Sequence, residues 1–277
     1  MQILLNDYER AEIEGLRQAL KDHIKNYGCF NSFKKTAHDG LLIAASLLNN
    51  DYKTFKKYKL KYTHHTADKM RGIDSLSTYK KTSDVCKTMQ YNANKNCICR
   101  YCYADKSINL YKASLQPSLI YNTLLLKYID ICADQIPFIN DRFFRFESFS
   151  DLQSAKHFKN LLQICKKNKN TVFTLWTKAA PVLDKYMQQE KINKLPNNLN
   201  IIYSEPQINK IIDASDDYIN SKQARLNQKN KIKVFSVFND EKKRQESKMY
   251  LCKNKCIDCL KCYKKSKNII YIAEKLH

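Results

Sequence analysis

Residues 143–151 read Phe-Phe-Arg-Phe-Glu-Ser-Phe-Ser-Asp, a short apolar run that passes directly into a polar one. Residues 143–146 have the length and aromatic content of a buried strand, and polar turn residues follow at once. An apolar periodicity that begins at about residue 152 predicts a helix over 152–167. This strand, turn and helix set the pattern for the second half of the chain.

The same unit recurs towards the C-terminus. Further strands are expected at residues 171–176, 199–203 and 233–238, with helices over 179–189 and from Gln207 onward. Strands that alternate with helices form parallel βαβ units. Because no glycine-rich turn follows the first strand, neither a dinucleotide-binding fingerprint nor a P-loop is present. The predicted fold class is α/β, a partial or complete parallel (β/α) barrel, with an open doubly wound sheet as the alternative.

The N-terminal half is expected to be mainly helical. Apolar residues at helical spacing predict helices over residues 7–27, 39–50, 104–113 and 118–135. Residues 66–96 are rich in turn-forming residues and are expected to be irregular. The chain therefore divides into a basic helical N-terminal region (1–70), a barrel-like core (71–245) and a C-terminal cysteine-rich segment (246–277).

The charge of the chain is strongly positive. Its 277 residues include 49 Lys and Arg against 27 Asp and Glu, a formal net charge of +22. Such a charge favours nucleic acid as a partner, and the Lys and aromatic residues that alternate from Tyr52 to Tyr62 could bind phosphates and stack on bases. Two alternatives remain open. The charge can be a bias of composition, and the alternating segment can be a solvated helix face.

The cellular compartment of the protein decides how its cysteines are interpreted. The chain has no apolar run of about 18 residues and no basic start followed by an apolar stretch, which predicts a cytoplasmic protein without a membrane partner. In a reducing compartment, clustered cysteines indicate metal or redox chemistry in place of disulfides. Cys29, Cys132 and Cys165 stand apart from the clusters and are expected to be small buried hydrophobes.

A terminal cysteine group closes the chain with the spacing Cys-x3-Cys-x2-Cys-x2-Cys. Its members are Cys252, Cys256, Cys259 and Cys262. Four thiolates suit tetrahedral zinc or an iron–sulfur cluster. Zinc sites usually combine two Cys-x2-Cys pairs across a longer loop, so one dense run favours the cluster, with zinc as the alternative.

A first cysteine group lies about 150 residues earlier. Its members are Cys86, Cys97, Cys99 and Cys102. The ending Cys99-Arg100-Tyr101-Cys102 resembles the end of the radical S-adenosylmethionine motif, Cys-x3-Cys-x-aromatic-Cys, although Lys95 stands where the first cysteine would be. The resemblance implies a [4Fe–4S] cluster on Cys86, Cys99 and Cys102, with one open iron that binds S-adenosylmethionine.

Polar residues follow three successive predicted strands. Because the carboxyl ends of parallel strands share one edge, where barrel sites lie, a cofactor pocket is expected there. Its predicted lining residues are Glu147, Ser148, Asp151 and Ser204. The alternative is that such residues only cap the helices that follow.

Several short motifs together resemble one family. They are Asp74-Ser75-Leu76-Ser77-Thr78, Cys86, Cys99-x2-Cys102-Tyr103-Ala104, the segment Arg145–Asp151, Leu175-Trp176-Thr177-Lys178 and the terminal cysteine run. Over residues 70–263 the chain is similar to the phage gene product 88 family, which resembles radical S-adenosylmethionine barrels. Cys97 is additional to the shared pattern.

Three functional hypotheses follow. The first is an iron–sulfur, radical S-adenosylmethionine-like enzyme with one or two [4Fe–4S] clusters, acting on or near nucleic acid. The second is a non-catalytic nucleic-acid-binding protein with structural zinc or iron–sulfur sites. In the third, thiols from both groups share one cluster, which predicts about four irons per chain against about eight for two separate clusters.

Overall fold

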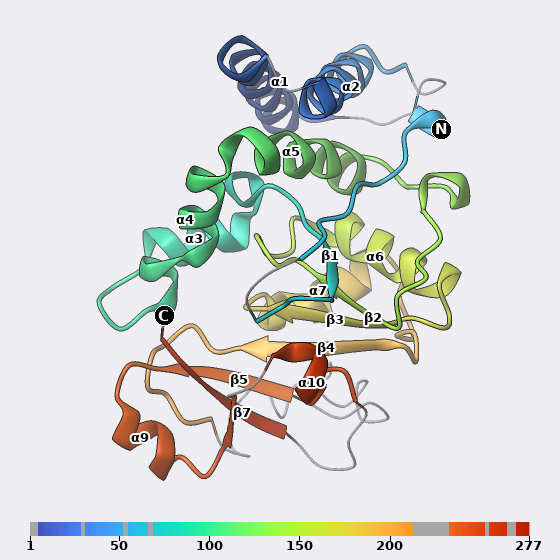
Figure 1. Cartoon of the computed structure of the whole chain (residues 1–277). Helices are drawn as coiled ribbons and strands as arrows, with labels where there is room; N and C mark the ends of the chain where they lie inside the picture. The colour runs from blue at the N-terminus through green and yellow to red at the C-terminus, as the bar shows by residue number, and fades with distance from the viewer. Residues whose placement is uncertain are drawn as a thin grey trace.

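The structure is a computed structural model that describes residues 5–28, 31–51, 55–65, 69–212, 233–252, 255–264 and 270–276 (Figure 1). Its helices are α1 (Asp7–Tyr27), α2 (Asn31–Leu48), α3 (Asp84–Tyr91), α4 (Tyr103–Leu110), α5 (Lys112–Tyr128), α6 (Ala155–Lys167), α7 (Ala180–Gln189), α9 (Glu241–Glu246) and α10 (Cys256–Cys259). Its strands are β1 (Asp74–Leu76), β2 (Phe143–Phe146), β3 (Val172–Thr177), β4 (Leu199–Ser204), β5 (Lys233–Phe238), β6 (Tyr250–Leu251) and β7 (Ile270–Lys275).

The strands form one seven-stranded parallel sheet in the order β1-β2-β3-β4-β5-β7-β6. This confirms an α/β fold of partial-barrel type. Across the described ranges β6 and β1 do not pair, so the sheet is open and the complete barrel is not formed. Lys69, just before β1, links the two ends of the sheet, because its carbonyl accepts from the Cys256 amide at 2.8 Å and its ammonium pairs with Glu274 on β7.

The two faces of the sheet differ in chemistry because alternate side chains point in opposite directions. One face carries buried apolar side chains such as Phe144, Phe146 and Leu175, which belong to the main core together with residues of α5, α6 and α7. The register aligns Arg145 with Thr174, which in turn pairs with Asn200 on β4. The face opposite the helices is therefore partly polar, and we call it the polar face.

The N-terminal helices form an outer layer over α5 (Figure 1). Helix α1 begins with a capping box, in which the Asn6 side chain accepts from the Glu9 amide at 2.8 Å and the Glu9 carboxylate accepts from the Asn6 amide. Glu12 on α1 contacts Lys127 and Tyr128 of α5. None of the described helices is long and apolar enough to cross a membrane.

Several predicted boundaries are wrong. Helix α5 begins at Lys112 and contains Pro117, where a start at residue 118 was expected. Burial of most of its residues from Gln116 onward offsets the backbone hydrogen bond that the proline lacks. This helix ends at Tyr128, and a 3-10 turn (Ala133–Gln135) lies where its continuation was expected. Residues 207–212 are not helical, and the rest of the helix expected from Gln207 lies outside the described residues.

The segment expected to be irregular contains two regular elements, β1 and α3. Helix α3 is capped by Ser83, whose side chain accepts from the Cys86 amide at 3.2 Å. The Ser83 hydroxyl also donates to the carbonyl of Leu152 at 3.0 Å, just before α6. This cap fixes the position of Cys86 relative to the carboxyl edge of the sheet.

Candidate functional site

The carboxyl edge of β1, β2 and β3 is built from hydrogen-bonded polar side chains. Ser148, after β2, donates its amide to the Ser77 hydroxyl at 3.0 Å and its own hydroxyl to Ser75 on β1 at 2.7 Å. The Ser148 carbonyl accepts from the Tyr103 hydroxyl at the start of α4. Ser148 thus connects this edge with the helix that follows the first cysteine group.

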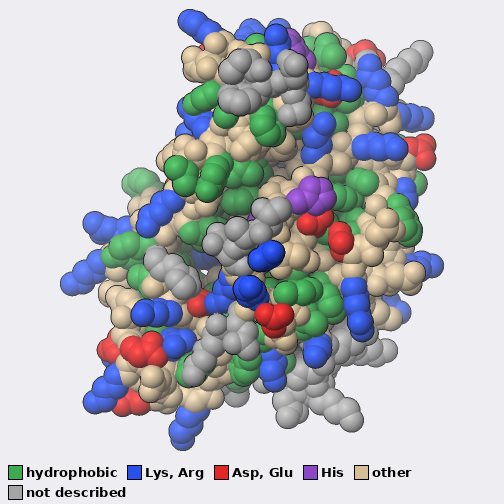
Figure 2. All heavy atoms as spheres, viewed as in Figure 1, with side chains coloured by type: hydrophobic (Ala, Val, Ile, Leu, Met, Phe, Trp, Pro, Cys, Tyr) green, Lys and Arg blue, Asp and Glu red, His purple; other side chains and the backbone are tan. Residues whose placement is uncertain are grey.

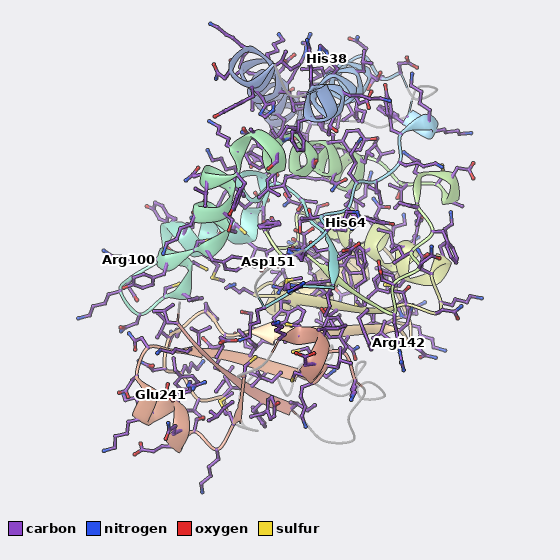
Figure 3. All side chains as sticks on the ribbon, viewed as in Figure 1. His38, His64, Arg100, Arg142, Asp151 and Glu241 are labelled. Carbon is purple, nitrogen blue, oxygen red and sulfur yellow. The ribbon has the colours of Figure 1, made fainter. Side chains whose placement is uncertain are left out.

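Asp151 organises the turn after β3. Its carboxylate accepts from the Thr177 hydroxyl at 2.6 Å and from the Lys178 amide at 2.8 Å. Figure 3 shows Asp151 in the interior, between the layer of α3 and α4 and the strands. Burial raises the pKa of Asp151, and the nearby Lys178 ammonium opposes that rise. Asp151 is not the cap of the helix that follows it, because Ser154 caps α6, and its contacts instead position Lys178.

Lys178 brings two segments of the first cysteine group to one place. Burial lowers the pKa of its ammonium, but the charges of Cys99, Asp151 and Cys86 outweigh burial and raise it. Burial raises the pKa of Cys86 to about 12 and that of Cys99 to about 11, while Lys178 opposes both shifts. At neutral pH these thiols are protonated unless a bound cation displaces the protons.

The loop that carries Cys97, Cys99 and Cys102 is attached to the turn after β4. Cys97 forms an antiparallel bridge with Gln207, and the Ile98 amide donates to the Pro206 carbonyl at 2.9 Å. Cys99 lies in a 3-10 helix (Ile98–Tyr101), and Cys102 immediately precedes α4. The first group therefore lies at the carboxyl edge of the sheet, where the sequence predicts a site.

A second lysine, Lys80, contacts Cys102. The Lys80 ammonium lies 3.7 Å from the Cys102 sulfur and 2.5 Å from the Asp105 carboxylate of α4. Lys80 is buried, with 3% of its surface exposed. Two ammonium groups thus act on the thiols of the first group, Lys80 by contact and Lys178 by its charge, and neither lysine belongs to a pattern that sequence analysis detects.

Glu147 does not share the environment of the thiols. Its backbone adopts a positive φ of 54° directly after β2. One carboxylate oxygen accepts from the Thr78 amide at 3.2 Å and hydroxyl at 3.0 Å, and the other lies 3.4 Å from His157 of α6. Burial raises the pKa of Glu147 to about 8 and lowers that of His157 to about 3. Both groups belong to the core between the sheet and α6.

Ser204 ends β4 and is buried at the same edge of the sheet, where it pairs in register with Phe235. The next residue, Glu205, is also buried and accepts from the Gln207 amide at 2.9 Å. Glu205 also pairs with Lys210 at 3.3 Å. These contacts fix the turn on which the first cysteine loop rests.

The terminal cysteine group packs on the polar face of the sheet. Lys233 of β5 donates to the carbonyls of Cys262 and Lys264, both at 2.7 Å. Asn200 of β4 donates to the Tyr263 carbonyl at 3.0 Å, and the Tyr263 ring contacts Trp176 at 6.2 Å between centroids. The chain thus returns across β3, β4 and β5 and brings its last cysteines to this face.

The thiols of the terminal group raise one another's pKa. Burial raises the pKa of Cys262, and the charges of Cys256, Cys252 and Cys259 add to the rise. Burial also raises the pKa of Cys252 to about 12. Arg145 and Lys69 oppose the rise at Cys256, and Arg145 stacks over the Trp176 ring at 4.2 Å.

The described cysteines are all free thiols. In the described ranges no three His, Cys, Asp or Glu side chains converge as they would on a single metal ion. Cys165 is buried as expected, Cys132 is half-buried, and Cys29 lies outside the described residues.

The positive charge is distributed over the molecule. On the face shown in Figure 2, Lys and Arg side chains are scattered along the outline and also near the centre. In the segment predicted to alternate Lys with aromatics, Phe55 and Tyr58 are buried, and Tyr62 packs against Phe144 at 5.0 Å between centroids. Tyr52 lies outside the described residues. The described aromatics of this segment pack inward, which supports the solvated-face alternative.

Comparison with known proteins places most of the chain in one family. The model of the family described as Gene product 88 matches residues 44–274, which excludes α1. No curated protein and no solved structure matches the chain.

Proposed function

The chain belongs to the gene product 88 family, a phage family, and from this premise we propose that it is an iron–sulfur protein of radical S-adenosylmethionine-like type. One observation carries the proposal. Cys86 and Cys99 come from separate segments, and at the carboxyl edge of a parallel sheet the charge of Lys178 lowers the pKa of both against burial. Cys102 lies in the same loop as Cys99 and faces Lys80. Catalytic sites of parallel α/β sheets lie at this edge.

The residues at this edge fit a polynuclear cluster. Three or four free thiols are the ligand chemistry that iron–sulfur clusters require. Zinc binds sulfur at about 2.3 Å, so its four thiolates must crowd within about 4 Å of one another. The thiols affect one another's pKa, but no three of the described ones converge as they would on a single ion. This spacing suits a four-iron cluster, which is wider than one zinc ion. A bound [4Fe–4S] cluster would supply one-electron chemistry at this edge.

The other residues at this edge would surround the cluster and its substrate. Lys80 and Lys178 offset the negative charge that deprotonated thiolates would bring into a half-buried site. Asp151 orients Lys178 through its backbone amide. Ser148 and Ser204 offer polar groups at the same edge, where S-adenosylmethionine would bind beside Cys86, Cys99 and Cys102.

The terminal group is proposed to hold a second cluster, with zinc as its alternative. Cys252, Cys256, Cys259 and Cys262 influence one another's pKa and are backed by Arg145, Lys69 and Lys233. The cysteines that affect the pKa of a terminal thiol all belong to the terminal group. This favours two separate sites over one cluster shared with the first group.

The test of the first site uses the double variant Cys86→Ala/Cys99→Ala, purified without oxygen. We expect it to lose about four irons and four sulfides per chain and to lose the change in visible spectrum that S-adenosylmethionine causes in the unmodified protein. Cys132→Ala is the matched control, since Cys132 is a half-buried free thiol outside both groups. Unchanged iron content in the double variant would contradict the assignment.

The second candidate function, non-catalytic nucleic-acid binding, rests on the net charge of +22. Its test is the affinity for a single-stranded oligonucleotide at two salt concentrations. A binding mode based on phosphate contacts predicts a loss of at least about tenfold between 50 and 200 mM salt. Absence of binding at the lower concentration would eliminate this candidate.

A further inference from the structure

A cavity of about 480 Å³ lies between α1, the segment that leads into α3, and the start of α5. It lies on the other side of this segment from the first cysteine group. Lys80 and Cys86 face that group, whereas their neighbours Lys81 and Lys87 line the cavity. Neither the family nor the cysteine sites account for this space.

Helix α1 leaves the space open. Its cavity-facing residues include Ala11, Gly15 and Ala19, one on each successive turn. A Cβ atom added at Gly15 would meet nothing within 4 Å. Glycine inside a helix is unfavourable, so a helix that served only for packing would be expected to carry a larger side chain at this position.

Two buried polar side chains line the cavity, His23 at 3% and Gln116 at 6% exposure. The Gln116 amide nitrogen donates to the Tyr79 hydroxyl at 3.2 Å, and hydrogen bonding from the Gln116 side chain raises the pKa of His23 against burial. Gln116 can serve only one of the two ring nitrogens, so the other has no partner among the described residues. Buried polar groups are costly unless something satisfies them, so this nitrogen points to a bound molecule with its own donor or acceptor.

The other lining residues indicate a flat and negatively charged molecule. Tyr27 and Tyr79 are among the lining residues, with the Tyr27 ring 5.0 Å from the His23 ring between centroids, and Lys81 and Lys112 are exposed lysines of the lining. Of the acidic lining residues, Glu12 is paired with Lys127 and Lys87, whereas Asp22 accepts from the neutral Gln18 amide and is outnumbered by Lys81 and Lys112. The lysines therefore supply positive charge to an incoming anion.

We propose that this cavity binds a free nucleoside 5′-monophosphate, with the base against His23 and Gln116 and the phosphate on Lys81 and Lys112. A heterocyclic base offers an in-plane donor or acceptor to the His23 nitrogen that Gln116 does not serve, and aromatic rings stack on such a base. The volume lies within the usual range for small-molecule pockets. The proposal is independent of the iron–sulfur sites.

The test is calorimetric titration of the full chain with AMP, GMP, CMP and UMP. Gly15→Leu fills the cavity without a clash at its Cβ and strengthens the helix, so it should fold and lose affinity by at least about tenfold. Lys25→Leu is the matched control, because it adds the same side chain to an exposed position of α1 that does not line the cavity.

A second pair of variants examines the phosphate site. The double variant Lys81→Gln/Lys112→Gln should weaken binding by at least about tenfold, whereas Lys21→Gln, an exposed lysine of α1 outside the cavity, should not. The proposal is overturned if none of the four nucleotides binds, or if Gly15→Leu binds like the unmodified protein. Tighter binding of a 5′-phosphorylated trinucleotide would also overturn it, because the site would then recognise the end of a strand.

Discussion

Glu147 and His157 form a buried pair of titratable groups whose charges are suppressed. The pKa of Glu147 is raised from 4.5 to about 8, so the folded protein keeps a proton that the unfolded chain releases between these values. The contribution of Glu147 to stability must therefore fall as the pH rises from about 5 to 8, since the folded state keeps this proton, whereas the lowered pKa of His157 acts in the opposite direction below about pH 6.5.

The variant Glu147→Gln removes this dependence. We expect the difference in free energy of unfolding between Glu147→Gln and the unmodified protein to shift in favour of the variant by at least about 1 kcal/mol between pH 5 and pH 8. Urea unfolding at several pH values measures it. His157 is common to both proteins, so a constant difference across this range would contradict the protonated state of Glu147.

His23 offers a test of the cost of an unsatisfied buried group. Because one of its ring nitrogens lacks a described partner, His23→Leu should raise the free energy of unfolding by about 1 kcal/mol in the absence of nucleotide. His38→Leu on α2 is the control, since His38 is exposed and should change stability little (Figure 3). Destabilisation by His23→Leu would show that the ring is packed as part of the core.

At the residue level, the sequence predicts the thiols but not their surroundings. The spacing of the cysteines is a local pattern and identifies both groups. Lys69, Lys80 and Lys233 approach the terminal or first group only through contacts distant in sequence, such as the 29 residues between Lys233 and Cys262. A lysine in a chain with so many lysines carries no signal of its own.

At the scale of elements, Lys233 attaches the terminal cysteine segment to β5. The ammonium is buried and donates to two carbonyls of that segment. Lys233→Met would leave both carbonyls without this donor, so we expect a loss of about 2–3 kcal/mol in stability and earlier proteolysis near the C-terminus.

Metal analysis of the same variant tests whether the two cysteine groups bind metal independently. Lys233→Met should lower the metal content of the terminal group and leave that of the first group unchanged. Lys243→Met is the control, because Lys243 is exposed on α9. Equal loss of metal from both groups would contradict two separate sites.

Strands β2 to β5 match their predicted positions to within one residue, because buried parallel strands are short continuous apolar runs. Strand β1 was missed because it has three residues, and α3 because its eight residues span only about two turns and none of them is fully buried. Strand β7 was missed because its apolar residues are followed by Glu274 and Lys275. Its parallel partner β5 lies more than thirty residues away, beyond the reach of local patterns.

At the scale of the whole molecule, the open sheet presents two surfaces for chemistry. The first cysteine group lies at its carboxyl edge, and the terminal group covers its polar face. The sequence predicted the partial barrel and its helical extension. Sequence analysis could not predict that the sheet stays open. The contacts of Lys69 with Cys256 and Glu274, which lie between the two ends of the sheet, join residues far apart in sequence.

The most direct test of the iron–sulfur proposal is the iron, sulfide and zinc content of the unmodified chain after anaerobic purification and cluster reconstitution. Two separate [4Fe–4S] clusters predict a coloured protein with about eight irons and eight sulfides per chain. About four of each without zinc would indicate a single cluster and contradict the two-site arrangement, whereas four of each with one zinc would assign zinc to one of the two groups. A colourless protein with one or two zinc ions and no sulfide would contradict the iron–sulfur assignment altogether.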